Sequence, residues 1–163
     1  MVVGWWREKR PTFVGLLTGA VAGLATVTPA AGYVSPVSAL IIGIAAGVVC
    51  YFAVAVKNKL RWDDALDVWG VHGVGGALGI VLLGVFASTA FNPDGTDGLI
   101  SGNWAFFAKQ LVAVAISSVW AFGFTYGMLW LIDRVTPVKV DQAAEESGLD
   151  AALHGETAYL GPN

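Results

Sequence analysis

Residues 36–56 read PVSALIIGIAAGVVCYFAVAV, an apolar run without a charged side chain that ends at three cations, Lys57, Lys59 and Arg61. About 20 consecutive apolar residues are enough for an α-helix to cross the ~30 Å hydrocarbon core of a bilayer. Comparable runs cover residues 11–32, 67–90 and 104–132. The sequence therefore predicts an all-α integral membrane protein, a helical bundle with four transmembrane helices in a lipid bilayer.

The composition supports a membrane protein and excludes several other classes. Of the 163 residues, 56% are hydrophobic and only 13% are charged, which is too apolar for the surface of a soluble domain. A formal net charge of −3 offers no basic surface, so nucleic acid is not an expected partner. The single cysteine, Cys50, excludes a disulfide framework and a paired-thiol metal site. No cofactor or metal is expected.

Cations are distributed unevenly between the connections of the four runs, and this predicts the orientation. Residues 33–35 and 91–103 contain no Lys or Arg, whereas the other flanks carry Arg7, Lys9, Arg10, Lys57, Lys59, Arg61, Arg134 and Lys139. Because Lys and Arg in short loops stay on the cytoplasmic side, both termini are expected in the cytoplasm. The membrane is expected to be the cell (inner) membrane. Residues 1–134 would form the membrane region and residues 135–163 a cytoplasmic tail.

The first apolar run has a second interpretation. Its basic start, apolar centre and small residues 29–31 also fit a secretory signal peptide. However, Gly15, Gly19 and Gly23 form a stripe along one helix face, and such stripes let helices pack closely in lipid. This favours a retained, tightly packed transmembrane helix.

The stretch that could carry chemistry is residues 63–76, DDALDVWGVHGVGG, where acids precede a helix that contains a histidine. Carboxylates suit the positive end of a helix, so Asp63, Asp64 and Asp67 are capping candidates, and Asp67 is expected to cap the helix or to bond nearby backbone amides. On a regular helix His72 lies ~7.5 Å further along the axis. Val68 on one side and Gly75 and Gly76 on the other would share its face and leave space beside the ring.

A narrow apolar passage of this kind selects what crosses it. Dehydrating an ion costs far more than dehydrating its neutral form, and burial favours the uncharged imidazole. Ammonium could therefore lose a proton beside His72 and cross as ammonia. The alternative is a core histidine bonded to a carbonyl of a neighbouring helix. Haem ligation would need a second inward histidine, and His154 lies in the polar tail.

Three ordered motifs resemble the Amt/Mep/Rh ammonium transporter family. They are DxxDVxxVHGVxG at residues 64–76, ATVTPAAGY at residues 25–33, and GLDxxxHGExAY at residues 148–159. The resemblance covers almost the whole chain and corresponds to the last four transmembrane helices of the family plus its cytoplasmic tail. It implies a partial ammonium-transporter fold.

The resemblance also implies roles for particular residues. His72 matches the second of two pore histidines that relay the substrate proton, Val68 matches an apolar pore-lining position, and Asp67 matches a buried acid that supports the histidine segment. Gly75 and Gly76 would support the pore. The tail region that couples subunits in the family is matched by Gly148, Asp150, His154, Gly155 and Tyr159. Family members are homotrimers, and bacterial ones are often blocked by a P-II type signalling protein.

Nothing in this chain matches the earlier transmembrane helices of the family, which carry the first pore histidine. Transport sites of inverted-repeat proteins form between the two repeats, so we expect this chain alone not to conduct ammonium. It would be a truncated reading frame, a gene fragment or one piece of a split transporter. A different class remains open: a non-transporting structural or regulatory membrane subunit. An enzyme is not expected, because no nucleophile, base and orienting group share a plausible spacing.

Overall fold

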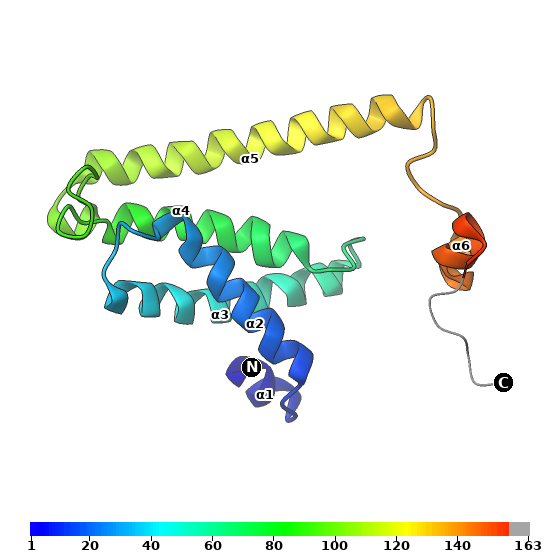
Figure 1. The fold of residues 1–163 in the computed structure, drawn as a ribbon, viewed down its shortest axis with the longest axis horizontal. Coiled ribbons are helices and arrows are strands. Elements are labelled where there is room, and N and C mark those ends of the chain that lie inside the picture. Colours follow the sequence, from blue (N-terminus) through cyan, green and yellow to red (C-terminus); the bar gives the residue numbers. More distant parts are fainter. Residues whose placement is uncertain (157–163) are drawn as a thin grey trace. The chain divides into compact units, whose positions relative to one another are not determined.

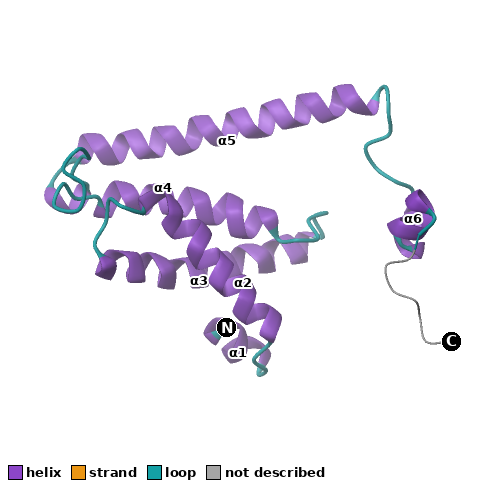
Figure 2. Cartoon of the chain, viewed as in Figure 1, coloured by secondary structure: helices purple, strands orange, loops and turns teal. Residues whose placement is uncertain are grey.

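The computed structural model describes residues 1–156, and within this range it contains helices and no strand (Figure 2). This confirms the predicted all-α class. The α-helices are α1 Val2–Glu8, α2 Phe13–Val27, α3 Pro36–Leu60, α4 Gly75–Phe86, α5 Trp104–Asp133 and α6 Gln142–Ser147. Short 3₁₀ turns are η1 Thr28–Ala30 and η3 Leu99–Ser101, and π turns are η2 Trp69–Val74 and η4 Asp150–His154.

Four helical segments are long and apolar enough to cross a membrane: Phe13–Ala30, Pro36–Leu60, Trp69–Phe86 and Trp104–Asp133. The chain divides into two compact units, one of residues 1–117 and one that begins at Ser118. The described part of the second unit holds the rest of α5, α6 and η4. The predicted division into a membrane region, 1–134, and a cytoplasmic tail, 135–163, stays a prediction.

Local side-chain chemistry determines where α2 and α3 begin and end. The Thr12 hydroxyl oxygen accepts a hydrogen bond from the amide of Gly15 at 3.1 Å, and that of Ser35 accepts one from Ser38 at 3.0 Å. Both are N-caps, which satisfy amides that have no partner within the helix. At its other end, α3 stops at Arg61, whose φ of 54° is left-handed. Such a residue cannot continue a right-handed helix.

In the first unit, α2 packs against both α3 and the continuous segment η2–α4 (Figure 1). Small side chains fill the centre of this contact, where Ala22, Cys50 and Val71 are buried together. Small residues suit a membrane bundle, because lipid provides no hydrophobic force between helices and close van der Waals packing must hold them.

Three glycines allow this close approach: Gly70, Gly75 and Gly79. A Cβ atom on Gly79 would overlap the carbonyl oxygen of Thr26 in α2, and one on Gly70 would lie 2.7 Å from Val54 Cγ2 in α3. The predicted stripe in the first run makes few close contacts among the described residues. A Cβ on Gly23 would meet nothing within 4 Å, one on Gly19 would lie 3.5 Å from Met1 N, and one on Gly15 would approach only Thr12, which caps the same helix. The close helix contacts are made by η2 and α4 instead.

Candidate functional site

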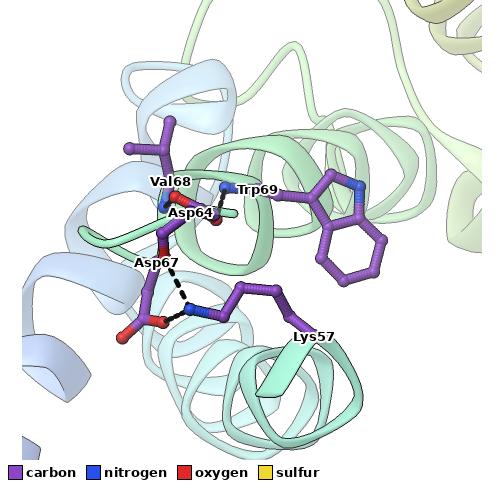
Figure 3. A network of polar contacts seen from close by, with 5 residues as sticks. All are labelled: Lys57, Asp64, Asp67, Val68 and Trp69. Carbon is purple, nitrogen blue, oxygen red and sulfur yellow. Dashed lines mark hydrogen bonds and ion pairs between the residues drawn. The ribbon is translucent and has the colours of Figure 1, made fainter. Parts of the chain in front are cut away.

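The acidic connection between α3 and η2 forms the base of the candidate site, and Asp64 is the residue that caps the turn. Its two carboxylate oxygens accept hydrogen bonds from the amides of Val68 and Trp69, each at 2.9 Å (Figure 3). The expectation that the Asp67 carboxylate caps the helix or bonds nearby amides is wrong in this respect. Asp67 uses its carboxylate for an ion pair, because its side chain points to α3.

That ion pair joins Asp67 to Lys57 of α3. The Lys57 Nζ atom lies 2.6 Å from Asp67 Oδ1 and donates a second hydrogen bond, also 2.6 Å, to the carbonyl oxygen of Asp64 (Figure 3). The Lys57 side chain is 7% exposed and that of Asp67 is 30% exposed. A single ammonium group therefore ties Asp64 and Asp67 to the end of α3.

The backbone of Asp67 is left-handed, with φ at 57°. This conformation is uncommon outside glycine, although Asp and Asn adopt it more readily than other residues. Its carbonyl oxygen accepts a hydrogen bond from the Val71 amide at 2.9 Å. Asp67 thus contacts Lys57 through its side chain and the π turn through its backbone.

The π turn decides which side chains share a face. Val68 and His72 are exposed, whereas Gly70 and Val71 are buried toward α2 and α3. Gly75 is also buried, and a Cβ there would lie 2.8 Å from Thr26 Oγ1 and 3.1 Å from Cys50 Sγ. Gly76 is half-buried, and a Cβ there would meet nothing within 4 Å.

These positions correct the expected surroundings of His72. Val68 is exposed, as His72 is, whereas Gly75 is buried and faces Thr26 and Cys50 in the contact with α2 and α3. The imidazole is exposed rather than enclosed, and it makes no hydrogen bond to any residue in the described range 1–156. The alternative of a histidine bonded to a neighbouring helix carbonyl is therefore not realised within that range.

A cavity of about 230 Å³ lies between α2, α3 and the acidic connection. Thr12, Thr18, Tyr51 and Asp67 contribute polar groups to its wall, and Val71 contributes an apolar one. His72 does not line this cavity. The cavity therefore lies apart from His72, with Asp67 in its wall.

The predicted tail residues form a local turn in the second unit. Asp150 and His154 begin and end η4, and Gly148 and Gly155 flank it with φ of 94° and 66°. Glycine suits both flanks because it adopts positive φ without a Cβ clash. Tyr159 lies outside the described residues. The described tail residues are exposed, and their regulatory role stays a prediction.

The Asp64 cap leads to a pH prediction. The amide of Trp69, and then that of Val68, hold the pKa of the Asp64 carboxyl below its ordinary value. A depressed pKa means that the cap stabilises the turn at neutral pH and is lost as the pH falls from about 4 through the lower folded pKa. We expect amide exchange at Val68 and Trp69, normalised to intrinsic rates, to accelerate over that range. In Asp64→Asn the normalised exchange should show no such pH step, and an unchanged step would contradict the assignment.

The fold and site together define a class: a multi-pass helical membrane protein with a histidine in a π turn inside one of its spanning segments. A profile of the Ammonium Transporter Family matches residues 1–159, and the chain belongs to this family. This confirms the family resemblance found in the three sequence motifs. It also agrees with the expectation that the chain is not an enzyme, because the relatives are ammonium transporters.

The relatives are longer than this chain. The ammonium transporter of Bacillus subtilis is 42% identical over 160 residues, which are 98% of this chain and 40% of the relative. Amt1 of Archaeoglobus fulgidus is 41% identical over 159 residues, with the same two shares. The solved structure of Saccharomyces cerevisiae Mep2 matches with a TM-score of 0.84 at 36% identity, over 93% of this chain and 36% of that one. The chain spans about 40% of the length of its curated relatives.

Sequence reasoning missed Lys57 as a site residue. It lies at the end of an apolar run, where a cation is explained equally well by membrane orientation. Its distance of ten positions from Asp67 matches no short-range helix spacing, because the two residues lie on different elements. The ion pair is visible only in the fold.

Proposed function

We propose that this chain contributes to a membrane pathway for ammonium or ammonia, with His72 and Val68 on the pathway wall. The observation that carries the proposal is the exposure of both side chains, Val68 directly before the segment Trp69–Phe86 and His72 one turn further along, inside it. Ionisable residues in spanning segments are costly against lipid and typically face a bundle interior or an aqueous cavity. The free imidazole therefore calls for a polar passage completed by other polypeptide.

The chemistry follows from the ring and its apolar neighbour. An ammonium N–H donates to the unprotonated imidazole nitrogen, and transfer of that proton leaves neutral ammonia and an imidazolium ion. Ammonia then crosses the apolar section at much lower dehydration cost than the ion. The imidazolium releases the proton to the next acceptor and returns to its neutral form. Val68, exposed beside the ring, keeps the wall apolar where the proton is removed.

The same proposal includes the topology and the partners. Both termini lie in the cytoplasm and the chain sits in the cell (inner) membrane, as the distribution of Lys and Arg favours. The complete assembly is a homotrimer. Its tail couples the subunits or binds a P-II type protein, and the residues involved are Gly148, Asp150, His154, Gly155 and Tyr159. The exposure of the first four of these residues supports a docking role.

The test is a chimera in which this chain replaces the matching 160-residue segment of the Bacillus subtilis relative. Methylammonium uptake is measured in cells without other ammonium transporters, at matched surface expression. We expect His72→Ala to lower uptake at least tenfold, equal to about 1.4 kcal/mol of barrier, and to change its pH profile. His154→Ala, in the tail, should leave the pH profile unchanged.

Three outcomes decide between the hypotheses. Unchanged uptake and pH profile in His72→Ala would refute the pore role. Uptake by cells that express only this chain would refute the expectation that a passage needs further polypeptide. An inactive chimera, together with co-purification of the chain with an intact transporter, would favour the non-transporting subunit.

A further inference from the structure

We infer that Lys57 is a positioning residue for His72: its ammonium group fixes the conformation of the π turn that presents the imidazole. The inference rests on the proposed function, since it gives a reason for fixing this ring. Lys57 is buried, and the partners of its ammonium group are Asp64 and Asp67, so any effect on His72 passes through the turn.

Lys57 reaches the π turn by two routes. Through Asp67 Oδ1 it holds the residue whose carbonyl accepts the Val71 amide, next to His72 in the chain. Through the carbonyl of Asp64 it holds the residue whose carboxylate binds the amides of Val68 and Trp69. One nitrogen atom therefore holds the two residues, Asp64 and Asp67, that accept the first backbone amides of the turn. Figure 3 shows the Lys57 contacts and the two amide bonds to Asp64.

Contacts from outside the turn are needed to stabilise its conformation. π turns are rare single-turn features that frequently occur at functional sites. Two residues before this turn, Asp67 has a left-handed backbone, a conformation that persists only where the surroundings enforce it. If the turn relaxed to a regular α-helix, the direction of every following side chain would shift around the axis. Val68 and His72, four positions apart, would still share a face, but that face would turn relative to the contact that Gly75 and Gly79 make with α2.

Burial and two short hydrogen bonds hold the Lys57 ammonium group in one position. Its side chain is 7% exposed, and its ammonium has two acceptors at 2.6 Å. A buried ion pair is weak evidence for net stability, but it can select one conformation over competing ones. The role assigned to Lys57 is therefore local order at η2, separable from stability of the whole bundle.

The experiment uses the full chain in lipid nanodiscs with His154→Gln, which leaves His72 as the one histidine. The ¹⁵N spectrum of the labelled imidazole and the amide exchange of residues 68–74 are compared for Lys57, Lys57→Met and Lys57→Arg. We expect Lys57→Met to split or broaden the imidazole signals and to speed exchange at residues 68–74 at least tenfold. Amides in the centre of α3 should keep their protection. Lys57→Arg, which retains the charge and the donors, should restore the single set of signals.

Lys109→Met is the matched control, because Lys109 is an exposed lysine in the spanning helix α5 and has no role in η2. It should leave the His72 signals unchanged. An unchanged imidazole spectrum in Lys57→Met would overturn the inference, and so would loss of protection throughout α3, which indicates a merely structural role. This experiment measures no transport, so its outcome is independent of the uptake test. If the chimera were inactive but Lys57→Met still split the His72 signals, the proposed function would be wrong and the positioning role would stand.

Discussion

Gly79→Ala is expected to destabilise the bundle of α2, α3 and α4 by about 3 kcal/mol, the upper end of the usual cost of overpacking. The added Cβ would overlap the carbonyl oxygen of Thr26 and lie 3.0 Å from its carbonyl carbon. Both are backbone atoms of α2, so no rotamer change relieves the overlap. The two helices must move apart, and Thr26, fully buried at their contact, would lose its packing.

Gly76→Ala is the matched control for this prediction. It lies one turn earlier in α4 and adds the same methyl group to a position where a Cβ meets nothing within 4 Å. Its effect on stability should stay within about 0.5 kcal/mol, as for substitutions away from packed features. Thermal unfolding in one detergent, followed by circular dichroism, compares the two variants with the parent. Equal unfolding temperatures for both variants would show that α2 and α4 do not approach as closely as described.

This pair of glycines shows what the sequence could predict about the fold. Run length and hydropathy are properties of continuous segments, and they predicted four spanning helices, which the structure contains. The packing partner of a glycine depends on which helix lies opposite. The spacing of Gly15, Gly19 and Gly23 therefore indicates close packing in the first run, whereas the tightest contact between α2 and α4 lies at Gly79, and no spacing in the sequence pairs Gly79 with Thr26.

The site was predictable in its composition but not in its geometry. An intramembrane histidine after a group of acids is a local pattern, and it pointed to His72, Val68 and Asp67. Placing Gly75 beside the ring assumed 3.6 residues per turn, and the π turn between them breaks that periodicity. The sequence makes Asp63, Asp64 and Asp67 equal capping candidates, and only the position of Lys57 explains why Asp64 caps the turn while Asp67 forms the ion pair.

Asp67→Asn is expected to destabilise the protein much more than Lys57→Met, although both remove the same ion pair. Asn keeps the size of the side chain and tolerates the left-handed backbone of residue 67. It leaves the Lys57 ammonium, 7% exposed, without a counter-charge. Breaking a buried pair in this way costs about 3–5 kcal/mol, and the remaining carbonyl of Asp64 places the expected value near the lower end of that range.

Lys57→Met leaves the Asp67 carboxylate without its partner, and this carboxylate is less buried than the Lys57 ammonium group. The Asp67 carboxylate is 30% exposed and lines the cavity of about 230 Å³, so water can replace the lost ammonium. An ion pair with a partly hydrated partner contributes far less to stability, about 1 kcal/mol or below. The methionine also removes the cost of burying a cation, so the net change should be small.

The double variant Lys57→Met/Asp67→Asn makes this asymmetry a sharp test. The double variant has no unpaired buried ammonium group, so it should be more stable than Asp67→Asn alone by about 2 kcal/mol. Such non-additivity is typical of directly contacting residues. Asp94→Asn, an exposed acid in the loop before η3, controls for the general effect of losing a carboxylate. Additive changes in the double variant would mean that Lys57 is hydrated or paired elsewhere in the membrane. In that case the burial of its ammonium, from which both its energetic and its positioning role are argued, would be wrong.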